Sequence, residues 1–478
     1  IDNHPLYKVS LTYLNESTFC NCRRLFSLTL TTKWLKYLLK PNSVSYRIIF
    51  RMNKVALETL GCKLNQAETE SLTKQLLNRG YQLVESPREA DIYVLNTCTV
   101  THIADRKARH LLRSAHCSNP QMLIIAIGCY AQRAPQELGQ LGVVNLILDN
   151  EEKSYLVEIL EDRLGKAGNQ GEKEARNSPF DHDHWGRTRS LVKIQEGCND
   201  FCSFCIVPYI RGRERSLPPE KVLEEIQARV AAGYKEVTLT GTKIGAYQWN
   251  GRDSNGLPRL IERILNETEI KRLRLSSLQP QDLTPELLKL WADERLCPHL
   301  HLPLQSGSEA ILQRMKRQYL IADYKKSIFL VREAIPDLTI TTDILVGFPG
   351  EGEREFEESY RFCEKMGFAN IHVFPYSPRR GTIAAKMPCQ VEEKVKKERS
   401  QRMLALAKRS AQHFREQFLG QTTPVLWERE SEPGGWSGLT ANYLRVFTQS
   451  KENLTNRLLP AKLIAEHSQG FFGELAST

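Results

Sequence analysis

The sequence predicts an α/β protein that continues into a small all-β domain, and three observations support that prediction. Short apolar runs alternate with stretches of helical periodicity twice along the 478-residue chain, over residues 52–162 and 190–386. The segment between these regions loses its apolar period and is rich in Gly, Asn, Lys and Glu. After residue 422 the pattern changes to short alternating runs broken by Pro433, Gly434 and Gly435, which is typical of antiparallel strands.

Composition sets limits on the class of protein. Hydrophobic residues make up 41% of the chain and charged residues 26%, which is ordinary for a globular protein. No segment approaches the ~20 apolar residues that span a bilayer, so we expect no membrane partner and a cytoplasmic location. The chain has 12 cysteines, an unusual number for disulfides in that compartment. We expect six of them to bind metal and six to be reduced filler: Cys20, Cys22, Cys117, Cys297, Cys363 and Cys389.

The net charge of +10 is concentrated at the start of the chain. Residues 1–51 hold eight Lys or Arg against Asp2 and Glu16, a surplus of six, so the rest of the chain carries only +4. That value is compatible with an RNA partner but does not require one. The first methionine is Met52. Residues 1–51 are therefore open to three interpretations: a gene-call artefact, which we favour, a targeting presequence, or a real extension. We exclude them from the predicted fold.

In residues 52–162 three predicted strands each end at a cysteine. Apolar runs over residues 55–61, 92–97 and 123–128 lead into Cys62, Cys98 and Cys129. Such runs are typical of buried parallel strands, and ligands of open α/β sheets collect at the carboxyl ends of the strands. A buried free cysteine is more often a small apolar side chain. Taken together with a second cysteine motif described below, the same placement three times nevertheless favours an iron–sulfur site in a doubly wound parallel-sheet domain.

Two segments next to this sheet carry charge without a definite role. The predicted helix over residues 104–116 is basic, and a solvated face and contacts with nucleic-acid phosphates are both open interpretations. Residues 163–189 predict a linker. Within it Asp181, His182, Asp183 and His184 offer metal ligands, but a polar cluster in a linker is more often solvated.

Residues 190–386 predict a partial (β/α)6 barrel. The expected strands are residues 190–194, 236–240, 272–275, 299–304, 339–346 and 370–374, and the expected helices are 219–232, 257–265, 285–291, 308–315, 321–334 and 353–366. Active sites of such barrels lie at the carboxyl ends of the strands. The informative motifs of this region fall at those ends.

The loop after the first strand of this barrel carries Cys198, Cys202 and Cys205 in the spacing C-x3-C-x2-C. Thiolate sulfur is the expected ligand of iron–sulfur clusters, and a closed [4Fe–4S] site takes four thiolates. Three ligands leave one iron with an open position that can bind a substrate. A structural zinc site is the alternative, but zinc needs a fourth cysteine or histidine, and none follows soon after.

From about residue 52 to its end, the chain resembles the radical SAM methylthiotransferase family. The resemblance is carried by runs that occur in the family's order: GCKLNQAETE (61–70), NTCTVT (96–101), GC (128–129), KIQEGC (193–198), LSSLQP (275–280), HLPLQSGS (301–308), DILVGFPG (343–350) and HVFPYS (372–377). It implies that one [4Fe–4S] cluster on Cys198, Cys202 and Cys205 binds S-adenosylmethionine. A second [4Fe–4S] cluster is implied on the three upstream cysteines.

The resemblance also implies further contacts with S-adenosylmethionine. Phe204 is expected to pack against its adenine, and the backbone at Gly241 is expected to hold its methionine amino group. The other implied contacts are Ser276, Ser277, Gln305 and Asp343. The sequence departs from the family at Gln279, where relatives often carry an acidic residue. An amide can still form hydrogen bonds but brings no charge, which puts the cofactor contact at this point in question.

The residues of the runs GCKLNQ and NTCTVT most resemble the MtaB branch of the family. That branch adds a methylthio group to C2 of N6-threonylcarbamoyladenosine beside the tRNA anticodon. The implied partners are tRNA, S-adenosylmethionine and an electron donor of the flavodoxin or ferredoxin type, and we expect a monomer. MiaB-like modification of isopentenyladenosine and RimO-like modification of a ribosomal protein aspartate remain alternatives. A catalytically inactive iron–sulfur RNA-binding protein is the alternative outside the enzymes.

The C-terminal part of the chain has two features. A charged helix is expected over residues 391–417, with a solvated face and an RNA-facing surface both open. The predicted radical SAM domain covers residues 190–410. Residues 411–478 resemble a TRAM-like RNA-binding domain, and this weaker match is carried by Gly438–Tyr443.

Overall fold

The computed structural model describes residues 53–164, 188–249, 255–432 and 434–476. The predictions for residues 1–51, for most of the linker and for Asp181–His184 therefore lie outside the described residues. The predicted domain boundaries stay predictions.

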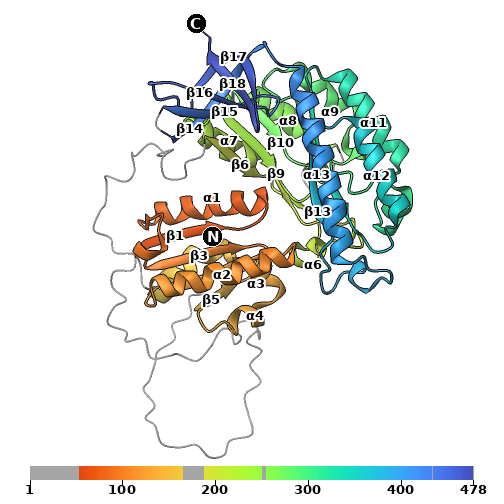
Figure 1. Cartoon of the computed structure of the whole chain (residues 1–478). Coiled ribbons are helices and arrows are strands. Elements are labelled where there is room, and N and C mark those ends of the chain that lie inside the picture. The colour runs from red at the N-terminus through yellow and green to blue at the C-terminus, as the bar shows by residue number, and fades with distance from the viewer. Residues whose placement is uncertain (1–52, 165–187, 250–254, 433, 477–478) are drawn as a thin grey trace, which may run out of the picture. The chain divides into compact units, whose positions relative to one another are not determined.

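Residues 53–164 form a five-stranded parallel sheet with helices on both faces (Figure 1), which confirms the predicted doubly wound fold. The strands lie in the order β2-β1-β3-β4-β5 and all of their pairings are parallel. In chain order the elements are β1 (Lys54–Thr59), α1 (Lys63–Asn78), β2 (Gln82–Leu83), β3 (Ile92–Thr97), α2 (His102–Ser118), β4 (Leu123–Gly128), α3 (Cys129–Arg133), α4 (Pro135–Gly139), β5 (Leu146–Leu148) and α5 (Leu156–Leu164).

The sheet is apolar on both faces because helices cover both. All six residues of β3 are buried. Tyr93 and Leu95 belong to the apolar cluster that includes Leu112 of α2, whereas Ile92 and Val94 belong to a second cluster formed with α1. This alternation follows from the strand geometry, in which successive side chains point to opposite faces.

The central region contains two three-stranded parallel sheets in the orders β10-β9-β6 and β11-β12-β13. A parallel bridge between Ser277 and His301 links them. No pairing joins β6 to β13 among the described strands, so the barrel is partial, as predicted. Its elements are β6 (Arg189–Lys193), β7 (Gln195–Glu196), α6 (Val207–Arg211), β8 (Arg215–Ser216), α7 (Pro219–Ala231), β9 (Glu236–Thr240), α8 (Gly256–Glu267), β10 (Arg272–Leu275), α9 (Pro285–Lys289), β11 (His299–His301), α10 (Glu309–Arg314), α11 (Ile321–Ala334), β12 (Thr339–Val346), α12 (Glu353–Met366), β13 (Asn370–Pro375) and α13 (Glu393–Glu416).

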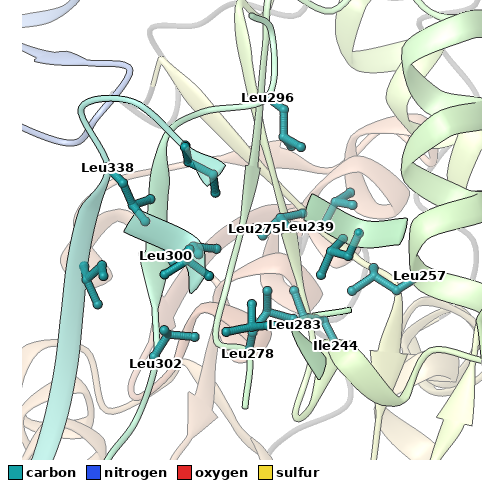
Figure 2. Close-up of a cluster of buried hydrophobic side chains, with 14 of the residues drawn as sticks. Leu239, Ile244, Leu257, Leu275, Leu278, Leu283, Leu296, Leu300, Leu302 and Leu338 are labelled. Carbon is teal, nitrogen blue, oxygen red and sulfur yellow. The ribbon is translucent and has the colours of Figure 1, made fainter. Parts of the chain in front are cut away.

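The barrel is held together by an apolar core of strand and helix side chains (Figure 2). Leu239, Leu275 and Leu300 come from β9, β10 and β11, and Leu257 comes from the covering helix α8. Each of the four side chains is at most 2% exposed. Full burial of one such side chain stabilises a fold by about 1.5–3 kcal/mol. This core fixes the strands whose ends carry the site.

The last five strands form a closed barrel in the order β14-β15-β16-β18-β17, which confirms the predicted all-β module. The strands are β14 (Thr422–Glu432), β15 (Gly435–Thr440), β16 (Arg445–Gln449), β17 (Leu458–His467) and β18 (Gly470–Leu475). Trp427, Val446 and Phe471 are fully buried in its core. None of the described helices combines the length and the apolarity needed to cross a membrane.

Candidate active site

Three cysteines lie at one edge of the N-terminal sheet. Cys62 follows β1 and caps α1, Cys98 follows β3, and Cys129 follows β4 as the first residue of α3. Because β1, β3 and β4 are neighbours, their carboxyl ends deliver the three thiols to the same place. Burial, together with the nearby Cys129 and Cys62, raises the pKa of Cys98 to about 11. The structure thus brings together the three upstream cysteines that the sequence singled out.

The surroundings of this triad suit a thiolate-bound cluster. Gly61 has a φ of +106°, and a Cβ there would lie only 2.8 Å from Cys98 Sγ, so the backbone passes directly against the thiol. Burial lowers the pKa of Arg211, but Glu68 and the Cys129 thiolate outweigh burial and raise it. Arg211 thus places a positive charge near the triad, where a cluster bound by thiolates would carry negative charge. The donor set and its charge therefore fit a [4Fe–4S] cluster.

A buried ionic network lies next to the triad. Glu68 of α1 accepts hydrogen bonds from Arg211 Nη1 at 2.9 Å and from Lys153 Nζ at 2.7 Å. All three side chains are at most 6% exposed. Burial acts to raise the pKa of Glu68, but Lys153 and Arg211 hold it well below its usual value. Arg211 also donates to Asn65 Oδ1 at 2.5 Å, so helix α6 is bonded to α1 at two points.

The other triad, Cys198, Cys202 and Cys205, lies on the loop between β7 and α6. Burial raises the pKa of Cys198 to about 11 and that of Cys205 to about 12, and neighbouring thiols of the triad contribute to both increases. Cys202 is 8% exposed, and its Sγ accepts a hydrogen bond from Arg317 Nη1 at 3.3 Å. The ten cysteines in the described residues are all free. Three converging thiols with a guanidinium beside one of them fit a cluster here as well.

A cavity of about 910 Å³ lies between α1 and the barrel strands. Its lining includes Cys62 and four of the predicted cofactor contacts: Gly241, Ser276, Ser277 and Asp343. Ser276 Oγ and Thr242 Oγ1 are buried and have no partner among the described residues. Unpaired buried hydroxyls are costly, so they point to a polar ligand at these strand ends. A Cβ on Gly241 would lie 2.7 Å from the Gln195 carbonyl oxygen, so this position has no room for a side chain.

Of the remaining predicted cofactor contacts, Phe204 and Gln305 lie outside the cavity lining. Phe204 packs edge-to-face on Phe348, with ring centroids 6.3 Å apart. Gln305 has a φ of +68°, and its backbone N–H donates to the Asp343 carbonyl at 2.8 Å. The Asp343 carboxylate lies 3.2 Å from His301 Nε2.

Gln279 lies beside the loop that carries Cys198, Cys202 and Cys205. Its Nε2 donates to Asp200 Oδ2 at 3.0 Å, and Lys243 Nζ lies 2.8 Å from Asp200 Oδ1. Although burial acts to raise it, these hydrogen bonds from Lys243 and Gln279 hold the pKa of Asp200 below its usual value. The amide is therefore used to fix the cysteine loop, a contact that an acidic residue would replace with repulsion.

Sequence reasoning missed the residue that joins the C-terminal barrel to the cavity. Tyr443, in the turn between β15 and β16, has a φ of +68° and stacks on His299 with ring centroids 4.5 Å apart. The Arg274 guanidinium lies 4.7 Å and that of Arg189 5.6 Å from the ring centroid. Burial acts to raise the pKa of Tyr443, but these cations and Lys63 lower it. Tyr443 ends the run Gly438–Tyr443 that carries the resemblance of this domain, but nothing in that run indicated a contact with the cavity.

The fold and the two triads define a class of iron–sulfur enzymes, and comparisons with known proteins agree with it. Residues 192–363 match the radical SAM superfamily, and residues 54–149 match the uncharacterized protein family UPF0004. A solved structure of the radical S-adenosylmethionine methyltransferase TsrM from Kitasatospora setae covers 70% of this chain and 77% of its own, with a TM-score of 0.52 and 14% identity. That similarity concerns the fold.

Curated relatives define the family more closely. The threonylcarbamoyladenosine tRNA methylthiotransferases MtaB of Bacillus subtilis and Aquifex aeolicus are 37% and 39% identical, over 86% and 82% of this chain and 94% and 96% of theirs. The tRNA-2-methylthio-N(6)-dimethylallyladenosine synthase of Thermodesulfovibrio yellowstonii is 33% identical over 89% of this chain and 99% of its own. The chain belongs to the radical SAM methylthiotransferase family.

Proposed function

We propose that this chain adds a methylthio group to C2 of N6-threonylcarbamoyladenosine beside the anticodon of a tRNA. The observation that carries the proposal is the pairing of two separate cysteine triads, at the carboxyl ends of two different parallel sheets. One triad suffices for a radical SAM enzyme, whereas transfer of sulfur calls for a second metal site. The similarity to MtaB relatives supports the threonylcarbamoyl substrate.

In this proposal each triad holds one [4Fe–4S] cluster: Cys198, Cys202 and Cys205 hold the first, and Cys62, Cys98 and Cys129 hold the second. With S-adenosylmethionine bound, these groups supply one-electron chemistry that activates a C–H bond and a sulfur for transfer. The protein contributes binding and electrostatics. Arg317 donates a hydrogen bond to Cys202 Sγ, and Arg211 places a positive charge near Cys62 and Cys129.

The predicted cofactor contacts have distinct tasks in the proposal. The unpaired hydroxyl of Ser276 forms a hydrogen bond with S-adenosylmethionine, and Ser277 beside it lines the same cavity. The backbone at Gly241, which lines the same cavity, holds the methionine amino group. Phe204 packs on the adenine. Gln305, which follows β11, and Asp343 of β12 supply polar groups. Low-dielectric surroundings strengthen each of these contacts.

The partners follow from the same chemistry. tRNA and S-adenosylmethionine are the substrates, and a flavodoxin- or ferredoxin-type protein is the proposed electron donor. The basic helices α2 and α13 offer phosphate contacts for the RNA. A tRNA substrate also supports a cytoplasmic location, and a monomer is the proposed state.

The proposal is tested by anaerobic reconstitution and counting of iron and sulfide per chain. We expect about eight irons in the parent and about four in the Cys62→Ala, Cys98→Ala, Cys129→Ala triple variant, because each cluster holds four. Cys117→Ala, which removes an exposed thiol outside both triads, should keep about eight. About four irons in both the parent and the triple variant would eliminate the second cluster and with it the sulfur transfer.

The substrate is tested with loaded enzyme, S-adenosylmethionine and a chemical reductant. Anticodon stem-loops containing threonylcarbamoyladenosine or dimethylallyladenosine are analysed by nucleoside mass spectrometry. A methylthio mass gain on the threonylcarbamoyl RNA supports the proposal. Gain on the dimethylallyl RNA alone would support the second candidate, for which the relative from Thermodesulfovibrio yellowstonii is the observation in favour.

A further inference from the structure

The cavity beside Cys62 is lined by more positive than negative charge. Four Lys or Arg side chains face it, and Asp343 is the one carboxylate among its described lining residues. That carboxylate is paired with His301, since Oδ2 and Nε2 are 3.2 Å apart. The cavity therefore presents a positive interior to whatever enters it. Its charged lining residues are Lys63, Lys408, Arg415, Arg445 and Asp343.

The four cations differ in whether they have partners. Arg445 is paired with Glu428 at 3.0 Å. The side chains of Lys63, Lys408 and Arg415, in contrast, form no hydrogen bond or ion pair with any residue that the structure describes. The Nε of Arg415 is buried in addition. A buried cationic donor without a partner is costly, so a bound anion would stabilise it.

Lys63 and Arg415 line the cavity from two different helices, α1 and α13. Lys63 is the first residue of α1 and directly follows Cys62. Its ammonium lies 5.9 Å from the ring centroid of Tyr443. Arg415 lies in the last turn of α13, and α13 packs against β13 of the barrel. Both are half-buried, whereas Lys408 is exposed.

The position of Lys63 favours a ligand on the base rather than on the RNA backbone. In the proposed function the modified adenine must come close to the triad of Cys62, Cys98 and Cys129, and Lys63 directly follows Cys62 in the chain. Phosphates are accessible to exposed helix faces and do not need this interior position. A carboxylate binds ammonium and guanidinium groups through strong charge-assisted hydrogen bonds.

We infer that Lys63 and Arg415 form a subsite for a carboxylate carried by the modified base of the RNA substrate. The inference rests on the proposed function and names the feature by which that substrate is selected. The threonyl group of threonylcarbamoyladenosine ends in a carboxylate, whereas a dimethylallyl group is uncharged. Lys63 also gives a physical meaning to the run GCKLNQ, in which it is the only charged residue.

The test measures RNA binding by the full chain, loaded anaerobically with iron and sulfide but without S-adenosylmethionine, so that no turnover occurs. Three labelled anticodon stem-loops are compared at one salt concentration: the threonylcarbamoyl RNA, its methyl ester and the dimethylallyl RNA. The variants are Lys63→Met and Arg415→Met. The matched controls are Lys74→Met on α1 and Lys397→Met on α13, two positions that do not line the cavity.

We expect the parent to bind the acid at least about tenfold more tightly than the ester, as loss of one charge-assisted contact predicts. Lys63→Met and Arg415→Met should weaken binding of the acid by a similar factor and change binding of the ester less than about twofold. The unchanged ester binding also shows that each variant is folded. The two control variants should retain the parent's preference for the acid.

Two results would overturn the inference. Equal binding of acid and ester by the parent would remove the carboxylate subsite. Equal weakening of all three RNAs by the variants would assign the two cations to backbone phosphates. The methylthio mass gain on the same RNAs separates the two proposals. Gain on the acid without any preference over the ester refutes the subsite alone, and gain only on the dimethylallyl RNA refutes the proposed substrate.

Discussion

Gly61→Ala should remove the second cluster while leaving the fold in place. The added Cβ would lie 2.8 Å from Cys98 Sγ and 2.6 Å from Cys98 Cβ. Ordinary nonbonded contacts are about 3.5–4.0 Å, so the thiol has to move by roughly 1 Å. Metal–ligand distances tolerate about 0.2 Å. The displacement is therefore several times larger than a cluster can accept, and we expect about four irons per chain instead of about eight.

Gly80→Ala is the matched control for backbone strain. Both glycines have positive φ values, +106° at Gly61 and +83° at Gly80, but a Cβ on Gly80 meets nothing within 4 Å. Each substitution should cost about 1–3 kcal/mol of strain, and only Gly61→Ala should lose iron. Iron and sulfide counts after anaerobic reconstitution, together with the midpoint of thermal unfolding, separate the two effects. If Gly61→Ala retains the parent's iron content, the close approach to Cys98 does not control the site.

Two further substitutions test the charges around the triads. Glu68→Gln should cost about 3–5 kcal/mol, since it leaves Arg211 and Lys153 buried without their carboxylate. The pKa of Glu68 is lowered in the folded protein, so its contribution is present above its ordinary value of 4.5 and is lost as the pH falls below that value. Thermal unfolding of parent and variant at pH 7 and pH 4 measures both effects, and a variant as stable as the parent at pH 7 would contradict them. Arg317→Met should lower the reduction potential of the cluster on Cys202 by on the order of 50 mV, because a donor and a positive charge are removed from the sulfur. A titration followed by electron paramagnetic resonance measures the shift, the iron count is the control, and an unchanged potential would show that Arg317 does not act on the cluster.

Local pattern predicted much of the barrel. β9, β10 and β12 have the bounds expected from apolar runs, and α11 and α12 have the bounds expected from helical periodicity. The expected strand over residues 299–304 was too long, since β11 ends at His301. Pro303 has no N–H for a strand pairing, and Gln305 has a φ of +68°. A buried run thus predicts a strand, but the residues at its end decide how far it pairs.

Contacts between distant segments could not be predicted from the sequence. Glu68 and Arg211 are 143 positions apart, and nothing local marks either as the partner of the other. Tyr443 has a positive φ, which is unusual for a tyrosine, and the run Gly438–Tyr443 did not indicate that its ring would stack on His299. The cysteines were predictable because metal chemistry restricts their number and spacing. No comparable rule fixes the number or spacing of the residues that hold the loops in place.

The contact between α1 and α6 explains how the two triads are held at a fixed separation. Cys62 caps α1, and Cys205 lies just before α6, so each helix begins beside one triad. Arg211 bonds Asn65 Oδ1 through Nη2 and Glu68 Oε1 through Nη1, and these two partners lie one turn apart on α1. A planar guanidinium that spans two positions fixes the rotation as well as the distance of the two helices, which a single ammonium cannot do. The spacing between the two metal sites is therefore held by buried contacts such as this arginine fork, together with the hydrogen bonds from Ser190 and Leu191 of β6 to Glu70 of α1, and not only by the loops that carry the cysteines.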